Sequence, residues 1–306
     1  MRLILSFTLI CVLLFTGCLK RNNTKYHFTG NIQVGTLSRT YIINLPPGYN
    51  DGNNYSLVIA MHGGGGSGEQ FERSSLLSEK ANSAGFIVVY PDGVQGNGVL
   101  KARTWNAGAC CDYARDNNID DVQFISRLID KLVAEYKINP KKIYATGHSN
   151  GGMMSYRLAC ELSGKIAAIA PCGSTMVVTS PCIASRAVPV IHFHSEKDTN
   201  IPYQGGSGSG PGTVGLHLAS LDSVMKLWSD KAACTNPNVV EVSNSRYTLT
   251  TWTGCNNNVS IKYYLTKDGG HSWPGGKAGS VIGDPPSTAI NANDLLWEFF
   301  QQHSLP

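Results

Sequence analysis

A serine between two glycines is the part of this chain whose spacing most clearly allows chemistry. Ser149 lies at the centre of the sequence Gly-His-Ser-Asn-Gly, between a β-rich run at 142–146 and a helix-like run at 152–160. A Gly-x-Ser-x-Gly motif between a strand and a helix predicts a sharp turn that presents the serine hydroxyl as a nucleophile. The N-terminus of the helix favours negative charge that develops beside it. The motif also arises by chance, so the chain must supply partners for this serine.

The serine needs a general base, and four histidines follow it before the last expected helix. They are His192, His194, His217 and His271. We favour His271, because it lies in a glycine- and proline-rich loop at 268–275, and a base on a late loop can reach back across a sheet. The first two share one face of a strand and are interpreted as structural. The third lies at the start of an expected helix.

The base needs an acid that orients it, and in α/β-hydrolases this acid lies between the serine and the histidine in the chain. Of seven carboxylates in that interval, only Glu196 and Asp198 directly follow a strongly buried strand, at 188–193. Catalytic acids of parallel sheets emerge at such strand ends. We favour Asp198, because the turn at 199–203 can fix its carboxylate, and we interpret Glu196 as a paired surface charge.

A glycine run at 63–66 follows the first buried strand and is expected to supply donors for an oxyanion. Backbone amides at Gly63 or Gly64, together with the amide of Asn150, would form this oxyanion hole. A phosphate-binding loop is the competing interpretation. It is disfavoured, because no Lys-Ser or Lys-Thr pair follows the glycines.

The elements that must position these residues alternate between strands and helices. Short β-like segments at 26–29 and 39–45 come first. Buried strands are expected at 56–61, 86–90, 142–146, 166–170 and 188–193, and helices at 70–84, 120–136, 152–160, 216–228 and 292–301. Apolar runs of this kind are typical of strands covered on both faces. The order predicts an α/β fold, a three-layer sandwich with a mostly parallel central sheet, in a single domain.

The chain begins with a targeting signal. Residues 1–17 combine a basic end, a short apolar core and small residues, which predicts a signal peptide. Cys18 follows Thr-Gly, as in a bacterial lipobox, and is the expected lipidation site; ordinary signal cleavage nearby is the alternative. Residues 18–30 would form a linker and the start of the fold, and residues 31–306 the single folded domain that carries Ser149. We expect a cell-envelope lipoprotein or a secreted protein.

Export makes disulfides the expected state of the seven later cysteines, with one thiol left over. Local pairs Cys172–Cys182 and Cys234–Cys255 are the expected bridges, and either Cys110 or Cys111 is expected to reach Cys160. No Cys-x-x-Cys or histidine-rich spacing indicates a metal, so no metal site is expected. A net charge of +4, without a long basic run beyond the linker, argues against a nucleic-acid partner.

Six motifs occur together in a recognisable order, at 61–67, 90–93, 104–111, 120–122, 147–154 and 270–275. From about residue 41 to its end the chain resembles the secreted polyhydroxybutyrate depolymerase and feruloyl esterase family, carbohydrate esterase family 1. The resemblance implies an α/β-hydrolase fold and ester cleavage without a cofactor. It places the catalytic serine, aspartate and histidine on Ser149, Asp198 and His271. One departure is His194-Ser195, where the family usually reads His-Gly.

The expected function is therefore that of a serine esterase acting on feruloyl or acetyl esters of plant polysaccharide such as xylan. Trp105, Tyr203 and Trp273 are expected to form an aromatic wall for substrate, with loop packing as the alternative. Depolymerisation of hydroxyalkanoate oligomers is the alternative activity. A peptidase would need a gating domain for which the chain has no room, and a carbohydrate-binding protein without catalysis is the non-enzyme alternative. We expect a monomer whose only membrane contact is the lipid anchor.

Overall fold

A computed structural model describes residues 26–50, 52–209, 213–236, 239–281 and 283–306. The predicted signal peptide and Cys18 lie outside the described residues. The prediction of an α/β fold with a mostly parallel central sheet is confirmed.

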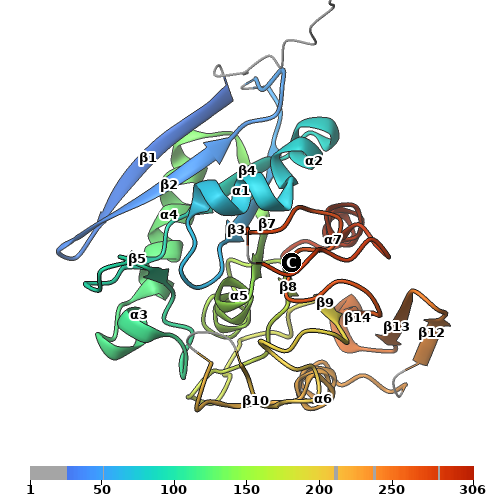
Figure 1. Ribbon diagram of the computed structural model, residues 1–306. Helices are drawn as coiled ribbons and strands as arrows, with labels where there is room; N and C mark the ends of the chain where they lie inside the picture. Colours follow the sequence, from blue (N-terminus) through green and yellow to red (C-terminus); the bar gives the residue numbers. More distant parts are fainter. Residues whose placement is uncertain (1–25, 51, 210–212, 237–238, 282) are drawn as a thin grey trace, which may run out of the picture.

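The centre of the molecule is a ten-stranded sheet (Figure 1). Its strands, in spatial order, are β1 (His27–Val34), β2 (Leu37–Asn44), β4 (Ile87–Pro91), β3 (Tyr55–Met61), β7 (Ile138–His148), β8 (Ala168–Cys172), β9 (Val190–Ser195), β14 (Ile261–Thr266), β13 (Tyr247–Trp252) and β12 (Val239–Ser243). Strands β4 to β14 are parallel, and the two at each edge run antiparallel to their neighbours.

Helices cover both faces of this sheet and create two hydrophobic cores. One face packs against α4 (Asp121–Glu135), α5 (Asn150–Glu161) and α6 (Leu221–Lys231), and the other against α1 (Gly68–Ser75), α2 (Leu77–Ala84) and α7 (Ala292–Gln301). Strand β3 contributes side chains to both cores: Leu57 and Ile59 lie in one, whereas Val58 and Ala60 lie in the other. A strand buried on both faces must be apolar at every position.

Shorter elements lie at the two ends of the sheet. A 3-10 turn at Asn256–Asn258 directly precedes β14 and so lies at the opposite, amino end. The carboxyl end carries β5 (Val94–Gln95), β6 (Arg103–Thr104), α3 (Asp112–Asp116), β10 (Gly206–Ser207) and β11 (His217–Leu218). Loops from this end carry the residues of the candidate site, as is usual for open α/β sheets.

Two helices differ from their predictions. The single helix expected at 70–84 is two helices, because Leu76 adopts a left-handed backbone with φ of 59° and ends the first one. The helix expected at 216–228 begins only at Leu221, after its cap Ser220 accepts a hydrogen bond from the amide of Ser223. His217 therefore lies in β11 and not at a helix start. The predicted helix at 292–301 is confirmed.

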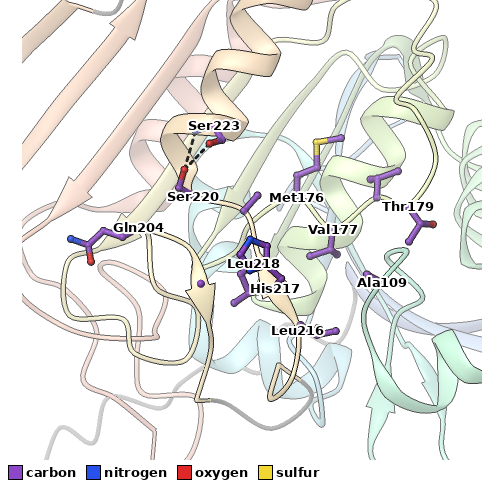
Figure 2. A pocket seen from close by; sticks show the side chains of 13 residues that line it. Ala109, Met176, Val177, Thr179, Gln204, Leu216, His217, Leu218, Ser220 and Ser223 are labelled. Atoms are coloured by element: carbon purple, nitrogen blue, oxygen red, sulfur yellow. Dashed lines mark hydrogen bonds between the residues drawn. The ribbon is translucent and has the colours of Figure 1, made fainter.

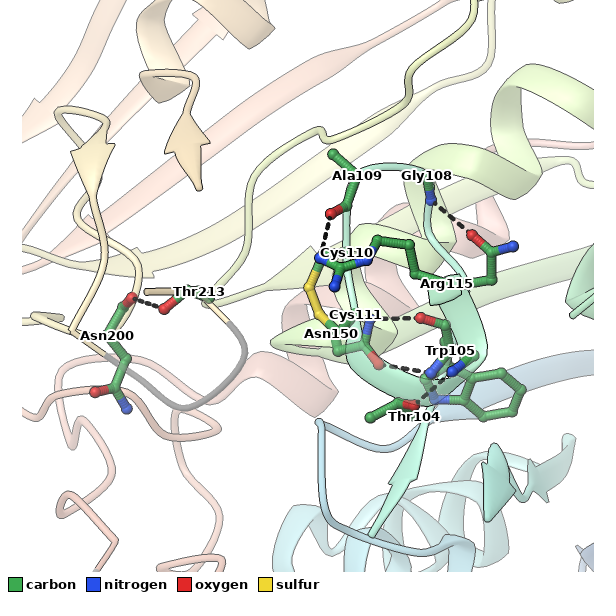
Figure 3. Close-up of a disulfide and its surroundings, with 12 residues drawn as sticks. Thr104, Trp105, Gly108, Ala109, Cys110, Cys111, Arg115, Asn150, Asn200 and Thr213 are labelled. Atoms are coloured by element: carbon green, nitrogen blue, oxygen red, sulfur yellow. Dashed lines mark hydrogen bonds between the residues drawn. A yellow bond between two sulfur atoms is a disulfide. The ribbon is translucent and has the colours of Figure 1, made fainter. Parts of the chain in front are cut away.

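The disulfide pattern corrects part of the prediction. Cys234–Cys255 is confirmed, whereas Cys160 pairs with Cys182, and Cys110 pairs with its neighbour Cys111 (Figure 3). Among the described residues Cys172 is the free thiol, and it is buried, so the expected bridge Cys172–Cys182 is wrong. Cys172 ends β8 inside the core, whereas Cys182 lies in the loop beyond it, beside the last turn of α5.

Candidate active site

Ser149 occupies a strained turn between β7 and α5. Its φ of 56° and ψ of −122° lie where a residue with a side chain is rarely found. The flanking glycines allow the turn. A Cβ at Gly151 would lie 2.2 Å from the carbonyl oxygen of Met61, and one at Gly147 would lie 2.5 Å from the carbonyl of Gly151. The turn therefore presents Ser149 at the head of α5, and neither neighbour tolerates a side chain.

Asp198 and His271 form a hydrogen-bonded pair at the carboxyl end of the sheet. Oδ2 of Asp198 lies 2.7 Å from Nδ1 of His271, and its Oδ1 accepts the amide of Ile201 at 2.9 Å. Asp198 is only 3% exposed. Burial alone would raise its pKa, but the hydrogen bond and charge of His271 hold the pKa below its ordinary value. An ionised carboxylate fixes the proton on Nδ1 and leaves Nε2 of the ring to act as a base.

The His271 ring lies beside the serine turn. Its centroid is 4.6 Å from that of His148, the residue directly before Ser149. Gly173 lies against both rings, because a Cβ added to it would be 3.2 Å from Nε2 of His148 and 3.4 Å from Nδ1 of His271. The residue before it, Cys172, accepts a hydrogen bond from the Ser149 amide through its backbone carbonyl. No hydrogen bond joins the Ser149 hydroxyl to this ring among the described residues. Such bonds often tighten only when substrate binds.

The glycine run presents unused amides next to the serine. Gly65 donates to the carbonyl of Arg103 and Gly66 to that of Gly63, at 2.8 and 3.0 Å. The amides of Gly63 and Gly64 make no such bond within the described chain, and a Cβ at Gly63 would lie 3.3 Å from Cβ of Ser149. The amide of Asn150 heads α5 and points out of the helix, as first-turn amides do. All three predicted donors therefore come from the surroundings of Ser149.

Trp105 has a different place from the one predicted. Its side chain is fully buried, and its Nε1 donates to the carbonyl of His62 at 3.0 Å. Its backbone holds Asn150 from both sides: the Trp105 amide donates to Oδ1, and the Asn150 side-chain amide donates to the Trp105 carbonyl, at 2.7 and 3.0 Å (Figure 3). Trp105 is thus a support for the residue after the serine, and its expected place in an aromatic wall is wrong.

The structure places the other two predicted substrate-binding aromatic residues, Trp273 and Tyr203, in different surroundings. Trp273 is 2% exposed, packs edge-on against Phe71 and donates to Asn293, so it belongs to the core and not to a substrate wall. Loop position alone does not reveal which way an aromatic ring turns. Tyr203 is half-buried, and its hydroxyl accepts from Gln204. A contact between Tyr203 and substrate stays a prediction.

A buried chain of polar side chains leads to Asp198 and was not foreseen. The Tyr156 hydroxyl lies 2.8 Å from Nδ1 of His192, whose Nε2 lies 3.1 Å from Nδ1 of His194. Nε2 of His194 donates to the Ile201 carbonyl at 2.7 Å and lies 3.4 Å from Oδ2 of Asp198. Burial lowers the pKa of both histidines and keeps them neutral. Their interpretation as structural missed this contact with the acid.

Two further residues of the site carry no signal in the sequence. Asp284 accepts the amide of His271 at 2.7 Å and so holds the histidine loop. His148 is half-buried beside His271, its buried Nε2 has no hydrogen-bond partner within the described chain, and desolvation lowers its pKa to about 3. Among the described residues no group of three histidine, cysteine or acidic side chains is placed to hold a metal ion.

Comparison with known proteins assigns the family. The family model described as phospholipase/carboxylesterase matches residues 50–211, which is more than half of the chain. The chain belongs to this family. The matched part contains the glycine run, the Ser149 turn and Asp198.

The chain is also similar in sequence to several named esterases. Feruloyl esterase B of Piromyces equi is 28% identical over 88% of the chain and 46% of its own length. The bifunctional acetylxylan esterase/xylanase XynS20E of Neocallimastix patriciarum is 30% identical over 72% of the chain, which spans 29% of that protein. The chain thus covers less than half the length of these relatives. A probable feruloyl esterase C of Aspergillus terreus is 28% identical, and the match covers 83% of its length.

Solved structures agree on the fold. An acetyl xylan esterase from Aspergillus awamori superposes with a TM-score of 0.63 at 15% identity, covering 90% of this chain and 99% of the other. A thermostable esterase gives a TM-score of 0.57 at 16% identity, over 92% of this chain and 64% of that one. The fold of the phospholipase/carboxylesterase family is therefore shared at low sequence identity. Within the described residues no helix is long and apolar enough to span a membrane.

Proposed function

We propose that the protein is a serine-dependent carboxylic ester hydrolase with Ser149 as nucleophile, His271 as base and Asp198 as the orienting acid. The observation that carries the proposal is the 2.7 Å bond between Asp198 and His271, next to a serine held at φ of 56° at the head of a helix. An ionised acid, a base of fixed tautomer and a strained nucleophile are the parts that acyl transfer needs.

The reaction would run through an acyl-enzyme. Nε2 of His271 takes the proton of the Ser149 hydroxyl while its oxygen attacks the ester carbonyl. The amides of Gly63 or Gly64 and of Asn150 stabilise the oxyanion, and one well-placed donor contributes about 3–4 kcal/mol. His271 then gives the proton to the departing alcohol. Water, deprotonated by the same ring, attacks the acyl group and releases the carboxylic acid.

Feruloyl or acetyl esters on plant polysaccharide are the proposed substrates. Support comes from relatives that are named feruloyl esterases and an acetylxylan esterase. The alternative, cleavage of hydroxyalkanoate oligomers, finds no support among the relatives described above. Three disulfides support an oxidising, extracytoplasmic compartment. A lipid anchor at Cys18 and a monomeric state complete the proposal.

Replacement of the nucleophile tests the proposed function. Ser149→Ala should lower kcat for p-nitrophenyl acetate and methyl ferulate by at least about 10⁴-fold, because no other group takes over the covalent step. Ser180→Ala, at an exposed serine outside the site, is the matched control and should retain full activity. Undiminished hydrolysis by Ser149→Ala would reject the assignment.

A further inference from the structure

Trp105 links the two places from which the proposed oxyanion donors come. Its indole nitrogen donates to the carbonyl of His62, the residue before Gly63, at 3.0 Å. Its backbone exchanges hydrogen bonds of 2.7 and 3.0 Å with the Asn150 side chain (Figure 3). The position of Trp105 therefore sets the spacing between the glycine run and the head of α5.

The 105–111 loop, which begins at Trp105, is not packed on every side. It borders a cavity of about 550 Å³ whose lining includes Ala109 and residues 176–179 and 216–220 (Figure 2). The Ala109 amide donates to the carbonyl of Val177 at 2.8 Å, at the edge of this cavity. Because one side of the loop is hollow, its position depends on its hydrogen bonds.

Asp121 makes the buried bond next to Trp105. It is the first residue of α4 and is fully buried. Its Oδ2 accepts the amide of Asn106, the residue after Trp105, at 2.8 Å. Its Oδ1 accepts Nη2 of Arg39 at 2.7 Å. Both oxygens of the carboxylate thus have a donor, as a buried charge requires.

Arg39 approaches the same loop from the other side of the pair. It comes from β2 and is 4% exposed, and its Nη2 also donates to the carbonyl of Asp92 at 3.0 Å. Its guanidinium carbon lies 4.1 Å from the centre of the Phe124 ring and 5.8 Å from that of the Trp105 ring. A cation at such distances is attracted to the ring faces. The Arg39–Asp121 pair therefore contacts Trp105 at its ring and holds the amide that follows it.

Stability alone does not account for this pair. The cost of taking two charges out of water offsets much of their attraction, so apolar residues of similar volume often stabilise a fold equally well. Burial raises the pKa of Asp121 above its ordinary value, which reflects this cost. An apolar pair could not accept the amide of Asn106 or place a cation beside Trp105.

We propose that Asp121, paired with Arg39, is a positioning residue for the oxyanion hole. It fixes the amide of Asn106 and with it Trp105, which in turn holds the head of α5 and the glycine run at the spacing that a tetrahedral oxyanion needs. Asp121 itself touches no substrate. The inference rests on the proposed function and adds to it a residue from α4, outside the loops that carry the catalytic side chains.

Asp121→Asn in the full chain tests the inference. Both partners of the carboxylate are donors, so the amide nitrogen of asparagine would face one of them without an acceptor. We expect kcat for p-nitrophenyl acetate to fall by about 10- to 100-fold, less than the loss of about 10²- to 10³-fold that follows removal of an oxyanion donor. KM should stay within about twofold, because the oxyanion forms only in the transition state.

Two further variants separate this effect from poor folding. Arg39→Met/Asp121→Leu removes both charges together, so it should fold without an unpaired buried charge and still lose kcat to a similar extent. Leu132→Ala is the matched control, because Leu132 is a buried residue near the other end of α4. It should lower the urea midpoint but leave kcat within about twofold of the unmodified protein. A fall in kcat in Leu132→Ala as large as in the double variant would contradict the proposal.

A double-mutant cycle tests whether Asp121 acts through the Asn150 side chain. Asn150→Ala removes the group that the Trp105 backbone holds. In that background the fold-loss in kcat caused by Asp121→Asn should shrink by at least about threefold, because coupled residues are not additive. Equal fold-losses with and without the Asn150 side chain would overturn the proposal while the proposed function stands.

Amide hydrogen exchange supplies a measurement that does not depend on activity. In Asp121→Asn the amides of the 105–111 loop should exchange at least about 10-fold faster, whereas those of β14 should be unchanged. Unchanged exchange in the loop would overturn the inference. An unmodified protein that hydrolyses no ester would reject the proposed function instead, and the exchange rates would still show whether Asp121 holds the loop.

Discussion

Nε2 of His194 lies 3.4 Å from Oδ2 of Asp198, and both side chains are completely buried. The same nitrogen donates to the carbonyl of Ile201, whose amide in turn donates to Oδ1 of Asp198. His194 therefore lies against the carboxylate and also fixes the turn at Ile201, whose amide binds the carboxylate. His194 touches no substrate and is a positioning residue for the acid.

His194→Leu should lower kcat by about 10- to 100-fold, a rise of about 1.4–2.7 kcal/mol in the activation barrier, because loss of the bond to the Ile201 carbonyl would loosen the turn that holds the Asp198 carboxylate. KM should stay nearly unchanged, since the substitution lies away from the substrate. His194→Gln keeps an N–H group at similar reach and should recover much of the activity. Steady-state kinetics with p-nitrophenyl acetate would measure both. A rise in KM with full kcat would argue against a positioning role.

Asp198→Asn tests the assignment of the acid against its neighbour. The amide cannot fix the proton on Nδ1 of His271 in the same way, and we expect kcat to fall by about 10⁴-fold. Glu196→Gln is the matched control, because Glu196 follows the same strand but is exposed. It should retain full activity. The reverse result would transfer the role of acid to Glu196.

Local patterns account for the parts of the fold and site that the sequence could predict. The strand, Gly-x-Ser-x-Gly and helix around Ser149 are one continuous segment, and Asp198 follows directly on β9. The glycine run at 63–66 likewise follows directly on β3. In each case the functional residue lies within a few residues of the strand that positions it, so apolar runs and turn residues are enough to predict its place.

Features that depend on distant contacts could not be predicted. Asp284 holds the amide of His271 from 13 residues further along the same connection between β14 and α7, and no periodicity links the two. Trp105 and Trp273 lie in loops, yet their rings turn inward because the indole N–H groups find buried acceptors. Leu76 breaks a helix without glycine or proline, so its sequence gives no stop signal.

Gly151→Ala tests the close packing of the serine turn. The added Cβ would meet the backbone of Met61 and His62, which cannot move without disturbing β3. We expect a loss of about 3 kcal/mol or more in the free energy of unfolding, together with loss of activity. Gly164→Ala is the matched control, because nothing lies within 4 Å of its added Cβ. Urea unfolding of the two variants should therefore differ clearly, and equal midpoints would contradict the close contact.

Stability should fall as the pH drops below the ordinary pKa of histidine. Burial lowers the pKa of His62 and His303 to about 4 and that of His148 to about 3, and the pKa values of His192 and His194 are lowered as well. Above about pH 6.5 these rings are neutral in both states. Below it the unfolded chain takes up protons that the folded chain does not, so each such histidine costs about 1.4 kcal/mol per pH unit.

Replacement of one of these histidines measures its contribution to the pH dependence of the free energy of unfolding. His303 is a suitable site, because its Nε2 has no partner within the described chain and its ring packs against Phe299. Between about pH 5 and 6, His303→Phe should reduce the slope of unfolding free energy against pH by close to one proton. Asp198 does not interfere, since its lowered pKa moves its own contribution below this range. Urea unfolding at several pH values measures the slope, and an unchanged slope would mean that His303 titrates alike in both states.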